Sequence, residues 1–154
     1  MPYQIRGLVT DDVRALQSGR PDAYGNLPEH RVSDGSGTPC RHCLNSIANG
    51  EAFLVLAYRP FTTLQPYAET GPIFLHASPC ERAQLPNELP EILSSPEYIV
   101  RGYNAGEQIV YGTGGVVETN KIATRADQLL ADERISFVHV RSAKNNCFQC
   151  RIDR

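Results

Sequence analysis

Residues 53–58, Phe-Leu-Val-Leu-Ala-Tyr, form the most apolar run of this 154-residue chain. The run is far shorter than the roughly 20 apolar residues that span a bilayer. Its length, and its β-branched and aromatic residues, are typical of a buried β-strand. We therefore expect a central strand from Ala52 to Arg59, around which the rest of the sheet assembles.

Further strand-like segments flank this run, and most follow one another through short loops. Such an order favours an α+β fold with a mainly antiparallel sheet, in a single domain over residues 1–154. The final two segments predict a C-terminal hairpin, whereas residues 20–39 are rich in turn residues and predict a long ordered loop. The expected strands are Tyr3 to Leu8, Ile73 to His76, Tyr98 to Tyr103, Gly115 to Glu118, Ile135 to Ser142 and Phe148 to Ile152.

Two or three helices are expected at the periphery of the sheet. Thr10 is placed to cap a first helix, which Gly19 ends. The segment Ser78-Pro79-Cys80-Glu81 has the form of a capping box, and it predicts a short helix to about Leu85. Thr124 begins the last predicted helix, whose apolar residues recur at helical spacing.

Charge and hydropathy exclude several classes of protein. Fifteen basic and seventeen acidic side chains give a net charge of -2, which argues against general nucleic-acid binding. The sequence has no membrane-spanning run, and its N-terminal residues lack the apolar core of a secretory signal. We expect a cytoplasmic protein with no membrane association, in which the five cysteines are thiols, metal ligands or catalytic groups.

Two C-x-x-C pairs are the strongest chemical signal in the sequence. They are Cys40-Arg41-His42-Cys43 and Cys147-Phe148-Gln149-Cys150. Four thiolates suit a tetrahedral zinc ion, and two chelating turns can supply them. The sequence thus predicts a structural zinc site made of Cys40, Cys43, Cys147 and Cys150.

The spacing of the two pairs leaves alternatives open. About a hundred residues separate them, whereas compact zinc ribbons place their pairs about 15–20 residues apart. If a strand begins before Cys147, this residue and Cys150 lie an odd step apart and face opposite sides of the sheet. The alternatives are buried thiols without a metal, a redox-active pair, and a metal site that uses only some of these cysteines.

His76 and Cys80 form a second candidate site. A cysteine in the first turn of the helix predicted from Ser78 would have a stabilised thiolate, and His76 ends the preceding strand. The two residues are therefore candidates for a catalytic nucleophile and its base. They are equally candidates for zinc ligands in place of members of the C-x-x-C pairs.

Several stretches of the sequence carry a family resemblance: Pro39 to Cys43, Gly50-Glu51 before the apolar strand, Tyr67 to Phe74, and Val138 to Arg141 leading to Cys147. Together they resemble a bacterial family of unknown function, domain-of-unknown-function family 1203. It implies a bacterial origin and a single-domain extent, and no activity. Cys150 departs from the pattern expected in this family, so a smaller cluster of Cys40, Cys43 and Cys147 stays open.

The sequence hypothesis is a protein with a structural zinc site and a role in binding or regulation. Its partner would be an unidentified protein or small molecule. The alternative is a thiol-dependent enzyme that uses Cys80 with His76 as base.

Overall fold

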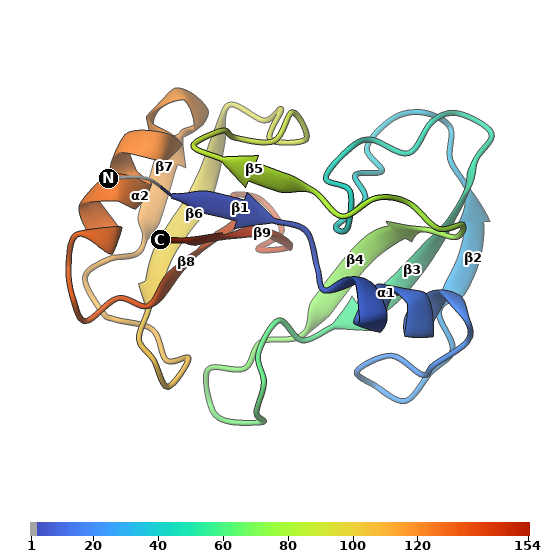
Figure 1. Cartoon of the computed structure of the whole chain (residues 1–154), viewed down its shortest axis with the longest axis horizontal. Helices are drawn as coiled ribbons and strands as arrows, with labels where there is room; N and C mark the ends of the chain where they lie inside the picture. Colours follow the sequence, from blue (N-terminus) through green and yellow to red (C-terminus); the bar gives the residue numbers. More distant parts are fainter. Residues whose placement is uncertain (1–2) are drawn as a thin grey trace.

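The computed structural model describes residues 3–154, which form two antiparallel sheets and two α-helices (Figure 1). The larger sheet contains, in spatial order, β5 (Gln84–Pro86), β1 (Gln4–Arg6), β9 (Phe148–Asp153), β8 (Phe137–Ser142), β6 (Glu97–Tyr103) and β7 (Gly115–Glu118). The smaller sheet contains β2 (Glu29–Val32), β3 (Ala52–Tyr58) and β4 (Gly71–His76). All pairings within these sheets are antiparallel, so the predicted α+β class with a mainly antiparallel sheet is confirmed.

The predicted central strand is confirmed as β3, the middle strand of the smaller sheet. It pairs with β4 through a register that places Leu54 opposite Leu75, and both residues are fully buried. Its other neighbour, β2, lies within the segment that was predicted to be a loop. β2 is an edge strand and every one of its residues is exposed, so it lacks the alternation of apolar residues that predicts a strand.

The helices cover different parts of the molecule. Helix α1 (Thr10–Gln17) turns Val13 and Leu16 into the core of the smaller sheet, and α2 (Ile122–Leu130) packs against β6 and β8 of the larger one. A short 3-10 helix, η1 (Thr119–Lys121), precedes α2. None of the helices within residues 3–154 has the length and apolarity needed to cross a membrane.

The prediction of a helix from Ser78 to about Leu85 is wrong. Residues 77–83 have no regular secondary structure, and Gln84–Pro86 form β5. The predicted C-terminal hairpin is present as β8 and β9, with a bulge between Val140 and Arg141.

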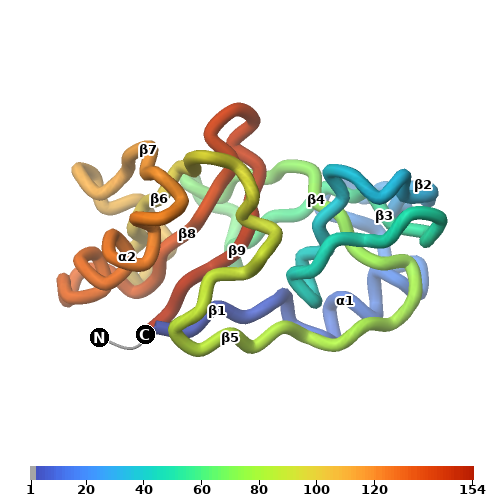
Figure 2. Tube along the Cα trace, turned by 90° about the horizontal axis from the view of Figure 1, so that it is seen from above, coloured from blue at the N-terminus to red at the C-terminus, as the bar shows by residue number. Residues whose placement is uncertain are grey.

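Each sheet has its own apolar core. One core joins the larger sheet to α2, and the other joins the smaller sheet to α1 and to Cys40 and Ile47. Figures 1 and 2 show the two sheets side by side, with the chain passing from one to the other between β1 and α1 and back between β4 and β5. These two crossings lie next to the segment around Cys40, and together they frame the candidate site.

Candidate metal site

Four side chains from three separate segments meet beside the core of the smaller sheet. They belong to Cys40, Cys43, His76 and Cys80, and their potential ligand atoms all lie within 4.8 Å of one another. Cys40 is buried, and the other three are partly buried. The arrangement unites the first C-x-x-C pair with His76 and Cys80, which the sequence had offered as alternative ligands.

The first pair lies on a tight turn. The backbone N–H of Leu44 donates to the carbonyl of Cys40 over 2.9 Å, and the N–H of Cys40 donates to the carbonyl of Asn45 over 2.9 Å. Leu44 has a φ of 56°, in the left-handed region that an L residue enters rarely and that allows the chain to reverse. This reversal brings the sulfurs of Cys40 and Cys43 to the same side of the turn.

His76 and Cys80 are positioned by the end of β4 and by α1. The side-chain amide of Gln17 donates to the carbonyls of His76 and Ser78, and the guanidinium of Arg14 donates to the carbonyl of Cys80 over 2.8 Å. Because side chains of α1 bind these carbonyls, residues 77–83 have backbone partners without forming a helix. The capping-box pattern was therefore overridden by tertiary contacts.

The sulfur atoms lie at close range, and that of Cys40 accepts a hydrogen bond from the backbone. The Sγ atoms of Cys40 and Cys80 are 3.9 Å apart, and Sγ of Cys43 is 3.5 Å from Nδ1 of His76. The backbone N–H of His76 donates to Sγ of Cys40 over 3.4 Å. Hydrogen bonds to sulfur favour the thiolate, which is the form that binds metals.

His42, inside the first C-x-x-C pair, is a neighbour of the site that the sequence did not reveal. Its Nδ1 lies 3.1 Å from Sγ of Cys80, and its Nε2 lies 2.9 Å from Oγ1 of Thr10. The ring is fully buried, and burial lowers its pKa, which favours the neutral imidazole. With Cys80 as a thiolate, Nδ1–H donates to the sulfur and Nε2 accepts from the Thr10 hydroxyl.

Thr10 thus has a role different from the predicted helix cap. It is the first residue of α1, where Val9 occupies the cap position, and its hydroxyl bonds to His42. No pattern in the sequence links residues 10 and 42, which lie in different segments.

Glu51 contacts His76 on the side away from the sulfurs. Nε2 of His76 lies 3.2 Å from Oε2 of Glu51, while Nδ1 faces Cys43. A carboxylate on one ring nitrogen fixes the tautomer and leaves the other nitrogen as the ligand atom. Nδ1 is therefore the atom that His76 offers to a metal.

The thiols of the three cysteines in the cluster have different pKa shifts. Hydrogen bonds from the Cys43 thiol and from backbone N–H groups lower the pKa of Cys40 to about 4, although burial opposes this. The same interaction with Cys40 raises the pKa of Cys43, and burial raises the pKa of Cys80 to about 11. The cluster thus holds one thiolate that attracts a cation.

The geometry around Cys80 differs from the one that the thiol-enzyme hypothesis requires. Cys80 is not at a helix N-terminus, and the imidazole within hydrogen-bond range of its sulfur is that of His42. His76 instead faces Cys43 and Glu51. These contacts suit ligands that surround an ion better than a nucleophile paired with His76.

The second C-x-x-C pair lies apart from this cluster. Cys150 is buried in β9, within the core of the larger sheet, and burial raises the pKa of its thiol to about 12. Cys147 precedes β9, and its Sγ contacts the carbonyl of Asn145 over 3.8 Å. Among the described residues, 3–154, neither joins a group of potential metal ligands. Phe148, between them, begins the strand, so Cys147 lies outside the strand and Cys150 lies within it, buried in the core of the larger sheet.

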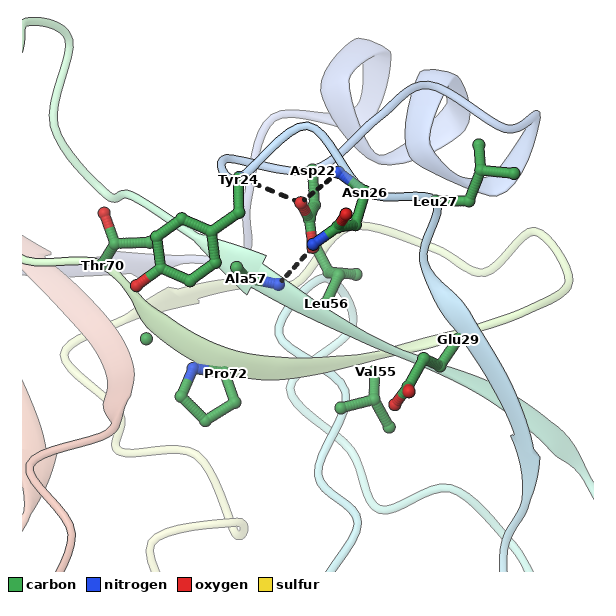
Figure 3. Close-up of a pocket in the computed structure, with 11 residues that line it drawn as sticks. Asp22, Tyr24, Asn26, Leu27, Glu29, Val55, Leu56, Ala57, Thr70 and Pro72 are labelled. Atoms are coloured by element: carbon green, nitrogen blue, oxygen red, sulfur yellow. Dashed lines mark hydrogen bonds between the residues drawn. The ribbon is translucent and has the colours of Figure 1, made fainter.

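A separate hollow of about 420 Å³ lies over the smaller sheet (Figure 3). Its main polar group is Asp22, whose carboxylate accepts the backbone N–H groups of Tyr24, Asn26 and Ala57. Because these donors already engage the carboxylate, Asp22 serves to hold the loop before β2 against β3. Asp22 thus has a structural role, and none of the residues that line the hollow belongs to the cysteine cluster.

Comparison with known proteins identifies a family and no activity. Residues 37–154 match the model of a family described as a protein of unknown function, DUF1203. The searches of curated proteins and of solved structures found no match. The matched segment covers most of the chain and all four members of the cluster. The chain therefore belongs to the DUF1203 family.

Proposed function

We propose that the chain binds one structural zinc ion through Sγ of Cys40, Cys43 and Cys80 and Nδ1 of His76. The observation that supports this most directly is the spacing of the ligand atoms. With Zn–S bonds of about 2.3 Å and a Zn–N bond of about 2.05 Å, a tetrahedron has S···S edges of about 3.8 Å and S···N edges of about 3.6 Å. The separations of 3.9 Å for Cys40–Cys80 and 3.5 Å for Cys43–His76 match these edges.

The chemistry of the donors favours zinc over harder ions. Three thiolates and one imidazole form a Cys₃His set, which is frequent in structural zinc sites, whereas magnesium and calcium prefer oxygen ligands. The surrounding groups also match such a site, because Nδ1–H of His42 would donate to the sulfur of a metal-bound Cys80 and Glu51 orients the imidazole of His76.

Positive charge from the protein offsets the excess negative charge of the site. Three thiolates around Zn²⁺ leave a net charge of about -1. Arg14 approaches the site through its bond to the carbonyl of Cys80, and the backbone N–H of His76 points at Cys40. These groups would stabilise the bound ion without occupying a coordination position.

The ion's role in this proposal is to hold the fold together. It would join the turn at residues 40–43 to the end of β4 and to the loop that carries Cys80. Four protein ligands leave no position for a substrate, so the site would supply no Lewis-acid chemistry. We assign the chain a binding role in a reducing, cytoplasmic environment, with zinc as a structural element.

Metal analysis of protein purified without added metal tests the proposal. We expect one zinc per chain, and cobalt substitution should give the thiolate-to-cobalt charge-transfer absorption of a site with three sulfurs. Cys80→Ser should remove most of the bound metal. Cys147→Ser is the matched control, because Cys147 is also partly exposed but lies outside the cluster.

Two results would overturn the proposal. One is folded protein without stoichiometric metal in which the partly exposed thiols of Cys43 and Cys80 titrate freely. The other is loss of metal in Cys147→Ser with retention in Cys80→Ser, which would restore the ligand set predicted from the two C-x-x-C pairs.

A further inference from the structure

A polar cleft of about 800 Å³ separates the first C-x-x-C turn from the C-terminal hairpin. One wall comes from residues around Arg41 and from β4, and the other from the segments before β6 and β9. Its volume is within the range of small-molecule sites, about 300–1,000 Å³. The cleft is distinct from the metal cluster, none of whose four residues lines it.

Arg41 is the unusual group in this cleft. It is 4% exposed, and it donates from Nε to the carbonyl of Phe148 over 2.7 Å and from Nη1 to the carbonyl of Pro39 over 3.0 Å. Among the ion pairs formed by residues 3–154, none includes Arg41. A buried guanidinium stays charged, and burying it without an anion is costly.

The guanidinium has further capacity for hydrogen bonds. Two of its five N–H groups bind main-chain carbonyls, which fix its plane, and Arg41 is among the residues that line the cleft. A planar, fixed guanidinium is the side chain best suited to bind a carboxylate or phosphate through two parallel hydrogen bonds.

The rest of the cleft supplies hydroxyl and amide groups around this charge. The Tyr98 hydroxyl accepts the backbone N–H of Ser95, so its own proton is free to donate. Gln149 and the hydroxyl groups of Ser94 and Ser46 also line the space. The one carboxylate among the described lining residues is that of Glu91, which is exposed.

We propose that the cleft binds a small organic anion, with Arg41 holding the ligand's carboxylate or phosphate group. Phe74 and Ile92 would contact the ligand's apolar part, and the hydroxyl groups would complete the shell around its oxyanion. The site does not depend on the metal for any contact, although the proposed zinc would fix the turn that carries Arg41.

A neighbouring pocket shows what distinguishes Arg41 from other buried arginines. This pocket of about 170 Å³ adjoins the cleft at Pro72, Asn145 and Cys147, and it contains the buried Arg141. Nη1 of Arg141 lies 3.7 Å from a carboxylate oxygen of Glu69, so its charge is already offset. Arg41 forms no ion pair with a carboxylate among the described residues, and the nearby groups that can carry negative charge are Cys150, Cys147 and Cys40.

Cys147 offers a built-in reporter, because it lines the cleft and directly precedes Phe148, whose carbonyl binds Arg41. The experiment compares alkylation of Cys147 by anionic iodoacetate and by neutral iodoacetamide in the native, metal-loaded protein. Peptide mapping by mass spectrometry separates Cys147 from the other cysteines. We expect Arg41 to raise the iodoacetate-to-iodoacetamide rate ratio by about threefold or more relative to an Arg41→Met variant.

Two probes, one inorganic and one organic, show whether the cleft binds a phosphate or a carboxylate. Inorganic phosphate and succinate are each added before alkylation, and protection of Cys147 by one and not the other identifies a phosphate or a carboxylate ligand. Protection should be lost in Arg41→Met and partly kept in Arg41→Lys, which retains the charge without the planar geometry.

Arg31→Met is the matched control, since it removes the same charge from the exposed strand β2. It should leave the rate ratio and the protection unchanged. Circular dichroism of each variant shows whether the protein is still folded, and its metal content tests the zinc proposal independently of the alkylation rates. Equal rate ratios in the parent protein and in folded Arg41→Met, with no protection by either anion, would overturn the proposal.

Discussion

Nε2 of His76 lies 3.2 Å from the carboxylate of Glu51, on the side of the ring opposite the sulfur of Cys43. The carboxylate therefore selects the tautomer in which Nδ1 is free to bind a metal. It also restricts rotation of the ring, so that Nδ1 stays directed at the cluster.

Replacing Glu51 should weaken metal binding without unfolding the protein. The side chain of Glu51 is 54% exposed, so little of the core depends on it. We expect Glu51→Gln to lower the zinc affinity by about tenfold, the lower end of the range for such outer partners. Competition with a chromophoric chelator measures the affinity.

Glu118→Gln is the control for this substitution, because Glu118 is an exposed glutamate of β7, outside the cluster. Its zinc affinity should equal that of the parent protein. Equal affinities for Glu51→Gln and the parent would show that the His76–Glu51 pair does not tune the site.

Gly7 controls how closely the chain after β1 approaches the turn at residues 40–43. A Cβ at this position would lie 1.7 Å from the carbonyl oxygen of His42, which is backbone and cannot rotate away. We expect Gly7→Ala to lower the free energy of unfolding by about 3 kcal/mol or more and to reduce metal content. Urea denaturation and metal analysis measure the two effects.

Gly115→Ala provides the comparison, because a Cβ there meets nothing within 4 Å and the residue is exposed. Its unfolding free energy should change by less than about 1 kcal/mol. Similar stabilities for the two variants would mean that β1 and the turn can separate without cost.

The sequence predicted those parts of the fold that have a local signature. The run at residues 53–58 was identifiable as a strand because its residues are apolar and β3 is buried between two neighbours. The edge strand β2 had no such signature, since all of its residues are exposed. The false helix at residues 78–85 had a good local pattern, but contacts from Arg14 and Gln17 decided its conformation.

The candidate site was half predictable for a similar reason. Cys40 and Cys43 are three positions apart in the sequence and share one turn, so their spacing identifies them as candidate chelating ligands. The choice between Cys147, Cys150, His76 and Cys80 as their partners depends on how two sheets meet, and spacing carries no information on that. The parity argument needed a strand that includes Cys147, whereas β9 begins at Phe148, so that argument does not explain why the second pair lies outside the cluster.

Removing the metal should loosen one half of the molecule first. The cluster connects the turn at residues 40–43 with β4 and, through Arg14 and Gln17, with α1. The larger sheet has a separate core. Hydrogen exchange with and without chelator should therefore show lost protection in α1 and at residues 38–47, with β6 and β8 retaining theirs.

The outcome that would contradict this expectation is uniform loss of protection in both sheets on chelation. It would mean that the two cores unfold as one cooperative unit, with the metal stabilising the whole chain.

His139 should make the protein sensitive to mild acid. The residue is fully buried in β8, and burial, together with Arg141, Arg151 and Arg101, holds its pKa well below the ordinary value of 6.5. The unfolded chain therefore binds a proton below about pH 6.5 that the folded chain does not. The contribution of neutral His139 to the free energy of unfolding is complete above this pH, and below it the free energy of unfolding falls by up to about 1.4 kcal/mol per pH unit.

The variant His139→Gln isolates this contribution. Arg141 bonds to Nδ1 of His139, and a glutamine at this position keeps an acceptor for Arg141 but does not titrate. Urea denaturation of both proteins from pH 7 to pH 5.5 gives the two slopes of unfolding free energy against pH. Effects of acid on the cysteine cluster are common to both proteins and cancel in the difference. We expect the parent's slope to be steeper by about 1 kcal/mol per pH unit, and parallel slopes would show that His139 takes up its proton in the folded state.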